Sequence, residues 1–383
     1  MQVVFFVLVL LTACSRAPSE LPLEAQACIV TFGSPALESA VRGALNKPTG
    51  DIRCYEMKAL TSLDVSAPWY SGTIRSLEGL QYATALTELR LRFNKISDIS
   101  QLSSLSRLRV LDLGYNQRIR NLRPLASLTR LEFLSLADNK ITNLSPLQNL
   151  TKLENLQLGY NPITDVSALA NLRQLESLSL NDTGLLSDIS PLANLPLLQT
   201  LHLDSNAILD VSPLAGLSSL KTLTLSANGL VDVSSLATLS NLEGLSLAFN
   251  GVRNLRPLGQ LRSLKRLSLE GNPQLRNLAP LQSLAQLEEL TLARNTRISD
   301  YTPLRGISYI RCPNIKYTGF DDRATLVSIR GLKRNSYLFL YGHGHSLDLS
   351  PGSQDSQNLE QLRSRGVAVF ENGQVTLECS NIW

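Results

Sequence analysis

Histidine and aromatic side chains are scarce in this chain of 383 residues, which contains three His, two Trp, ten Tyr and nine Phe. Three imidazoles leave few candidates for acid–base catalysis or for zinc ligation. A large excess of one charge is also lacking, because 36 Lys and Arg stand against 32 Asp and Glu, and a dedicated nucleic-acid binder normally carries a clear basic excess. These absences disfavour an ordinary enzyme and a nucleic-acid-binding protein, whereas 43% hydrophobic residues suffice for a large core.

Long apolar runs are missing except at the N-terminus. Val3–Leu11 is an unbroken apolar run of nine residues, far below the roughly 20 that a membrane-spanning helix needs but suited to the apolar region of a signal peptide. The run ends in Leu-Thr-Ala-Cys at residues 11–14, which resembles the lipobox of bacterial lipoproteins. That resemblance implies a signal peptide over residues 1–13 and a lipid on Cys14. An ordinary signal peptide is the alternative. The first two residues lack the basic side chain that such signals normally carry, so Met1 need not be the true start.

A lipid on Cys14 would keep the mature protein on a membrane, because two or more acyl chains anchor a protein stably. Residues 14–27, with two prolines and several polar residues, then form the lipidated Cys and a tether that leads to the fold. We therefore expect an exported protein that is lipid-anchored to the cell membrane, at the periplasmic face of an outer membrane or at the cell surface.

The middle of the chain repeats one motif, L-x-x-L-x-L-x-x-N, at a period of 22 or 23 residues. Ten units begin at Leu86, Leu108, Leu131, Leu153, Leu175, Leu198, Leu220, Leu242, Leu264 and Leu287. A period of this length indicates a solenoid in which each unit contacts only its neighbours. The central L-x-L alternates as a strand does, with both leucines inward, so stacked units predict a parallel sheet.

Two polar positions recur together with the leucines. The ninth position is Asn in nine of the ten units, with Thr183 as the exception, and its amide is expected to bond to the backbone of neighbouring coils. An Asp or Asn follows in every unit, and Ser or Thr, Pro, or both come shortly after it. That order is typical of a short capped helical turn. We expect these residues to be structural, with single 3₁₀ turns on the convex side and a shallow arc rather than a closed horseshoe.

The full pattern of residues 198–214, L-Q-T-L-H-L-D-S-N-A-I-L-D-V-S-P-L, resembles the 22-residue leucine-rich repeat of the internalin family. The resemblance implies an α/β solenoid with a parallel concave β-sheet. It also implies a helical N-terminal cap over 28–59, repeats over 60–309 and a small C-terminal cap over 310–383. We expect a cap helix over Ala36–Asn46 that begins at Ser34. Its shared apolar face would hold Leu37, Val41, Ala44 and Leu45.

The repeat falters after residue 310. Residues 337–340 and 367–370 predict strands, and residues 358–364 predict a short helix. His343-Gly344-His345 invites a metal-site or phosphate-loop interpretation. However, two His without a third ligand are a weak metal signal, and the Gly spacing matches no phosphate-binding pattern. We expect a turn there, and neither a metal nor another cofactor.

The cysteines other than Cys14 lie in the caps, outside the ten regular units. Four thiols in an exported chain indicate two disulfides with three possible pairings. We favour Cys28 with Cys54 and Cys312 with Cys379, because each bridge would then staple one end of the solenoid. Zinc binding is the rival interpretation, but no C-x-x-C spacing supports it.

The concave face is the default binding site of a solenoid, because its residues can vary without harm to the core. Outward strand residues and the turn residue before each ninth position line this face, and its aromatic residues are expected to anchor a ligand. The predicted ligand-binding residues are Phe93, Tyr115, Phe133, Tyr160, Phe249, Glu132, Asp138, Glu154 and Asp182. The basic residues at the two ends of the face are Arg90, Arg92, Arg109, Lys265 and Arg266. An acidic centre would suit a partner with a basic patch, although such residues also serve simply to cover strands and keep a surface solvated.

These features predict a non-enzymatic, monomeric protein that recognises a protein or other macromolecule by its concave face. The resemblance to internalins extends this to host adhesion by analogy. A cell-envelope scaffold that binds a bacterial partner is the second hypothesis. The third is an enzyme whose C-terminal residues form a catalytic module, which would require a free thiol, because the Ser and His residues show no catalytic arrangement.

Overall fold

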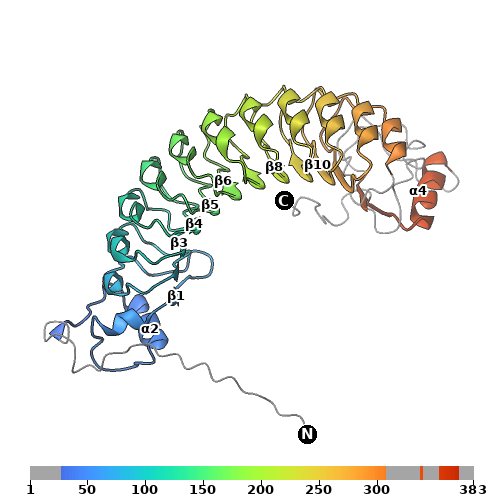
Figure 1. The fold of residues 1–383 in the computed structure, drawn as a ribbon. Helices are drawn as coiled ribbons and strands as arrows, with labels where there is room; N and C mark the ends of the chain where they lie inside the picture. Colours follow the sequence, from blue (N-terminus) through green and yellow to red (C-terminus); the bar gives the residue numbers. More distant parts are fainter. Residues whose placement is uncertain (1–26, 308–336, 340–352, 371–383) are drawn as a thin grey trace, which may run out of the picture.

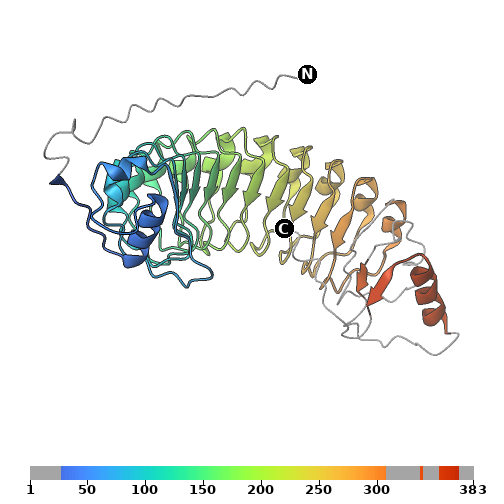
Figure 2. The ribbon, with the colours of Figure 1, turned by 90° about the horizontal axis from the view of Figure 1, so that it is seen from below.

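The computed structural model describes residues 27–307, 337–339 and 353–370. The repeats stack into an open arc, with one parallel sheet on its inner side and short 3₁₀ turns on its outer side (Figure 1). The eleven strands of this sheet follow one another in sequence order, and they lie side by side when the arc is seen from below (Figure 2). The predicted solenoid with a concave parallel sheet is confirmed.

Each coil contributes one strand of three residues to the main sheet. The strands are β1 (Ser62–Asp64), β2 (Glu88–Arg90), β3 (Val110–Asp112), β4 (Phe133–Ser135), β5 (Asn155–Gln157), β6 (Ser177–Ser179), β7 (Thr200–His202), β8 (Thr222–Thr224), β9 (Gly244–Ser246), β10 (Arg266–Ser268) and β11 (Glu289–Thr291). The central leucines are in register, so Leu89 of β2 lies beside Leu111 of β3 and Leu63 of β1. Because these leucines are buried and stack along the arc, they form one continuous core.

The convex side consists of 3₁₀ turns, as the sequence predicts. They are η3 (Leu80–Tyr82), η4 (Ser100–Ser104), η5 (Arg123–Leu125), η6 (Ser145–Leu147), η7 (Ser167–Leu169), η8 (Ser190–Asn194), η9 (Ser212–Gly216), η10 (Ser234–Thr238), η11 (Arg256–Gln260), η12 (Ala279–Ser283) and η13 (Thr302–Gly306). The side chain of the recurring Asp or Asn accepts a hydrogen bond from the backbone amide two residues later. Asp98 Oδ1, for example, accepts from the amide of Ser100 at 2.9 Å. In seven of these turns proline is the second residue, as Pro146 is in η6.

The ninth-position asparagines hold neighbouring coils together. Asn139 is fully buried. Its Nδ2 donates to the carbonyls of Leu113 in the preceding coil, at 3.0 Å, and of Leu136 in its own coil, at 3.1 Å. Its Oδ1 accepts from the amide of Ile119, at 3.2 Å. The side chain thereby satisfies backbone groups that lie between strands and turns, where water cannot reach.

Thr183 interrupts this asparagine ladder. Its hydroxyl donates to Asn206 Oδ1, and among the described residues its side chain makes no other hydrogen bond. The only described side chain that donates to the carbonyl of Leu158 is therefore that of Asn161, at 2.9 Å. The amide of Ile163 donates to the backbone carbonyl of Asn161 instead, at 2.8 Å. The fifth regular coil is thus joined to the fourth by fewer side-chain bonds than its neighbours.

The N-terminal cap contains the expected helix with shifted ends. Helix α2 (Pro35–Ala44) begins one residue earlier and ends two residues earlier than predicted, and Ser34 accepts from the amide of Leu37 at 3.5 Å. Leu37 and Val41 are fully buried and Leu45 packs against the core, as predicted, but Ala44 is exposed. A 3₁₀ turn, η2 (Glu56–Ala59), follows.

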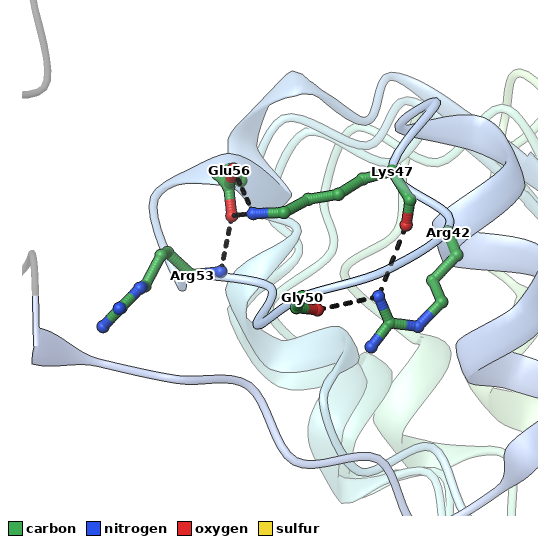
Figure 3. Close-up of polar contacts among 5 residues, drawn as sticks. All are labelled: Arg42, Lys47, Gly50, Arg53 and Glu56. Carbon is green, nitrogen blue, oxygen red and sulfur yellow. Dashed lines mark hydrogen bonds and ion pairs between the residues drawn. The ribbon is translucent and has the colours of Figure 1, made fainter.

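Polar contacts fix the loop between α2 and η2 (Figure 3). Arg42 Nη1 donates to the carbonyls of Gly50, at 2.9 Å, and Lys47, at 3.3 Å. Glu56 accepts from Lys47 Nζ at 2.8 Å and from the amide of Arg53 at 2.6 Å. Burial alone would raise the pKa of the Glu56 carboxyl, but these two donors outweigh it and hold the pKa below its usual value.

A disulfide joins Cys28 to Cys54 within this cap, with the Cα atoms 5.5 Å apart. The amide of Cys54 also donates to the carbonyl of Cys28, at 3.0 Å. The bridge therefore closes the segment that precedes α2 onto the start of η2. The other expected pair, Cys312 and Cys379, lies outside the described residues.

Three elements are described beyond the repeats. They are β12 (Tyr337–Phe339), α4 (Gln354–Ser364) and β13 (Ala368–Phe370), and β12 pairs with β13 in parallel. β12 begins at the predicted residue 337, and β13 begins one residue later than the predicted 367. The helix is longer than the predicted 358–364, because Ser353 accepts from the amide of Ser356 and starts the helix earlier.

Residues 1–26, which hold the predicted signal peptide and Cys14, lie outside the described residues. Within the described ranges no helix combines the length and apolar character that crossing a membrane requires.

Candidate ligand-binding face

A row of turn residues, here called the rim, borders the concave face where each strand ends. The rim residue precedes the ninth position in every coil, and all ten have a positive φ between 51° and 65°. They are Phe93, Tyr115, Asp138, Tyr160, Asp182, Ser205, Ala227, Phe249, Gly271 and Arg294. Only one of them is glycine, so nine residues adopt a left-handed backbone at a cost of about 1–2 kcal/mol each. Sequence reasoning missed this conformation.

The N-terminal part of the rim carries a cluster of four aromatic rings, here called the aromatic cluster. The ring centroids of Phe93 and Tyr115 lie 4.7 Å apart. Tyr70 packs edge-on against both, at 5.1 and 5.9 Å, and Trp69 stacks over Phe93 at 6.1 Å. The guanidinium of Arg92 lies 4.8 Å from the Phe93 ring and 4.6 Å from the Tyr115 ring. Trp69 is 85% exposed, so the cluster presents a large aromatic surface to solvent.

Trp69 and Tyr70 reach this position through an insertion, here called the strap, over residues 67–72. The central leucines of β1 and β2, Leu63 and Leu89, are paired although 26 residues separate them, against 22 or 23 in later coils. The extra length projects on the inner side of the arc beside β1 (Figure 1). The strap is tied to the next coil by bonds from the amide of Ala67 to Arg92 O, at 2.9 Å, and from Gly72 to the Phe93 carbonyl, at 3.2 Å.

A hydrogen bond fastens the strap to the third regular coil. Tyr70 Oη donates to Asp138 Oδ2 at 2.7 Å, and Gln117 Nε2 donates to the same oxygen at 3.3 Å. Desolvation of the phenol, together with its bond to Asp138, raises the pKa of Tyr70 to about 12. Asp138, which the sequence predicts as a ligand contact, therefore also holds the strap in place.

The structure brings together some of the predicted aromatic residues and separates others. Phe93 and Tyr115 belong to the aromatic cluster, whereas Phe133 lies within β4, and Tyr160, which is 49% exposed, lies farther along the rim. Burial raises the pKa of Tyr160, and nearby Asp182 raises it further. Phe249 is 50% exposed and stands apart, near the other end of the arc.

The predicted acidic residues differ in whether a nearby positive charge neutralises their carboxylates. Glu132 pairs with Arg109 of the preceding coil at 2.7 Å, and this bond raises the pKa of the guanidinium. Asp182 accepts from Asn181 Nδ2 at 3.0 Å. Glu154 is exposed, and no ion pair to it is present in the described part of the chain. The Arg109–Glu132 pair reduces the acidic character that the sequence indicates for the centre of the face, whereas the neutral amide of Asn181 leaves the charge of Asp182 in place.

His202 lies on the same face and makes more contacts than a lone surface histidine. Its Nδ1 is 3.1 Å from Thr224 Oγ1, and that hydroxyl donates to Asp204. Burial lowers the pKa of the His202 imidazole. Asp204 also accepts from the amide of Ser226 at 2.7 Å, so the group forms a structural polar network across two strands.

No constellation for metal chemistry is found among the described residues, since no three His, Cys, Asp or Glu side chains there could hold an ion together. His343-Gly344-His345 lies outside those residues. The described part of the face offers aromatic surface, charge and hydroxyl groups on a backbone that the asparagine ladder fixes.

Comparison with known proteins agrees with this architecture. The family model described as leucine-rich repeats, in two copies, matches residues 84–127, 129–171, 151–194, 173–216 and 240–283. The structure of internalin C2 of Listeria monocytogenes is 36% identical and superposes with a TM-score of 0.54 over 57% of this chain and 94% of that one. The chain is an internalin-like leucine-rich repeat protein.

Two further solved structures extend the likeness. An internalin of Listeria monocytogenes, InlF, is 28% identical over 89% of this internalin-like chain and 91% of its own, with a TM-score of 0.66. A leucine-rich repeat protein of Leptospira interrogans shares the fold at 20% identity and a TM-score of 0.63, over 85% and 92% of the two chains. None of the curated protein sequences gives a match. Proteins of this type are typically non-catalytic binding proteins.

Proposed function

We propose that this internalin-like protein binds a protein ligand with its concave face and catalyses no reaction. The aromatic cluster on the rim carries this proposal. Trp, Tyr and Arg are the residues that most often dominate protein–protein interfaces. Here they stand on a backbone that each coil fixes to the next, so little ordering accompanies binding.

We also propose that the protein is exported and anchored by a lipid on Cys14. The apolar run of residues 3–11 and the small residues before Cys14 support export and acylation. A disulfide between Cys28 and Cys54 fits an oxidising compartment. Host adhesion is the function we favour for the anchored protein, and an envelope scaffold with a bacterial partner is the alternative.

Site-specific photo-cross-linking on living cells tests the concave face. A photoreactive amino acid at Tyr160, on the rim, is expected to capture one protein partner, whereas the same amino acid at Gln148, exposed after the convex turn η6, should not. The double variant Phe133→Ala/Tyr160→Ala should fold with nearly unchanged stability and lose capture by a cross-linker at Tyr115. Equal capture from both faces would contradict a concave-face site.

The anchor and its orientation need separate measurements. Cys14→Ala should move the protein from the membrane fraction to the soluble fraction of the exporting cell. Digestion of the wild-type protein by protease added to intact cells would favour adhesion, and protection would favour the envelope scaffold. Titration of free thiols in the mature wild-type protein addresses the enzyme hypothesis, because only an unbridged Cys could serve as its nucleophile.

A further inference from the structure

The flank of the solenoid beside the aromatic cluster is basic. Lys95 and Lys140 each lie two residues after a rim residue, and Arg118 and Arg120 follow the rim residue of the coil between them. All four side chains are exposed, and within residues 27–307 none of them forms an ion pair. Since the coils are stacked in order, these charges form one patch, here called the basic flank.

Arg92 adds a fifth positive charge next to this patch. Its guanidinium lies against the rings of both Phe93 and Tyr115, and in the described part of the chain no carboxylate pairs with it. Its Nε is buried without a hydrogen-bond partner. By contrast, Arg90, two residues earlier at the end of β2, is paired with Glu88 at 2.7 Å. The positive charge at the N-terminal rim is therefore largely unpaired within the described structure. A cation that has lost part of its hydration is stabilised most by a nearby negative charge.

The same flank changes character in the next coils. There the residues after the rim are small or apolar, and Leu185, Leu209 and Val231 are 71%, 69% and 49% exposed. The basic flank of the first three regular coils therefore adjoins the aromatic cluster, and exposed arginines return on this side beyond these apolar positions, at Arg253 and Arg276. Asp138, the acidic rim residue in this region, is engaged by Tyr70 and Gln117.

We propose that the aromatic cluster and the basic flank together bind an acidic segment of a protein partner, with Trp69 as the aromatic anchor. The inference rests on the proposed protein-binding function and deepens it by naming the charge of the partner. Carboxylates on such a segment would meet the basic flank and Arg92, while an apolar or aromatic side chain packs on Trp69. A partner with a basic patch, which an acidic centre would suit, meets repulsion here.

Selection from a random-peptide phage library tests the charge of the partner directly. The bait is the full mature chain, kept soluble by Cys14→Ser. Enriched peptides are expected to be rich in Asp and Glu and to contain an aromatic residue. The triple variant Arg118→Glu/Arg120→Glu/Lys140→Glu and the variant Trp69→Ala should each bind these peptides at least about tenfold more weakly.

Matched variants make the result specific. Arg253→Glu/Arg276→Glu reverses exposed charges at the equivalent flank positions of two later coils and should leave the affinity unchanged. Circular dichroism of every variant should match that of the wild type. Enrichment of Lys- and Arg-rich peptides, no enrichment at all, or equal binding to the triple variant would each overturn the inference.

A vesicle assay separates a protein partner from a lipid surface. Vesicles that contain phosphatidylglycerol should not displace the selected peptide more than vesicles of phosphatidylcholine do, and displacement by the anionic vesicles alone would overturn the inference in favour of a lipid surface. Failure here is distinguishable from failure of the proposed function. Basic peptides whose binding is lost in Phe133→Ala/Tyr160→Ala would refute the acidic partner yet leave concave-face binding standing.

Discussion

Removal of one ladder asparagine should destabilise the solenoid strongly, and the structure gives the size of the effect. In Asn139→Ala the carbonyls of Leu113 and Leu136 keep other donors, the side chains of Asn116 and Asn161. The amide of Ile119 has no other partner among the described residues. One orphaned buried donor costs about 1–3 kcal/mol, and the lost bonds to carbonyls that retain a partner add a smaller amount. We expect a total loss of about 3 kcal/mol.

Urea unfolding followed by circular dichroism measures this loss, with two control variants. Thr183→Ala removes a single hydrogen bond at the same position of another coil and should cost about 1 kcal/mol. Asn143→Ala removes an exposed hydrogen bond from the amide of Ser145 and should lower the free energy of unfolding by about 1 kcal/mol or less. If Asn139→Ala were no more destabilising than either control, the asparagine ladder would not be the main link between coils.

Three further predictions concern single positions. Thr183→Asn should raise the free energy of unfolding by about 1 kcal/mol, because a second amide would again reach the carbonyl of Leu158, and urea unfolding would detect the gain. Ala227→Gly should be stabilising by up to about 1 kcal/mol in the same assay, since glycine adopts the positive φ of the rim without strain, whereas an unchanged or lower stability would argue against rim strain. The pKa of Tyr70 is raised to about 12 from an ordinary 10.0, so its contribution to stability is fully present below pH 10 and is lost as the pH rises through 12. Tyrosinate absorbance should show this late titration in the wild type but not in Tyr70→Phe.

The repeat made most of the fold predictable from the sequence. A period of 22 or 23 residues fixes which leucines point inward, and this in turn fixes the parallel order of strands and their register. The convex turns followed from the Asp or Asn and the residues just after it. Prediction was less accurate in the caps, where no neighbouring repeat confirms the boundaries, so α2 starts at Pro35 and its last residue, Ala44, is exposed.

The candidate site was less accessible to sequence reasoning for two physical reasons. Trp69 and Tyr70 lie in an insertion that departs from the period, and Tyr70 contacts Asp138 across 68 positions of the chain. The 26-residue spacing between Leu63 and Leu89 was the available signal. Charge was the second difficulty, because an ion pair between coils, such as that of Arg109 with Glu132, cancels part of the charge that the sequence places along the face.

Adjacent rim residues are not independent of each other, and this constrains how the face can change. The Phe249 ring fills the space above the next rim residue, so a Cβ at Gly271 would lie 2.6 Å from Phe249 Cδ1. Phe93 is accommodated differently, since its ring packs against that of Tyr115 in the next coil. Tyr115 and Tyr160 are instead followed on the rim by a carboxylate, Asp138 and Asp182 respectively. A rim ring is therefore compatible with a glycine, a second ring or a carboxylate in the next coil. Whether a new aromatic anchor fits on this face thus depends on the rim residue of the coil that follows it.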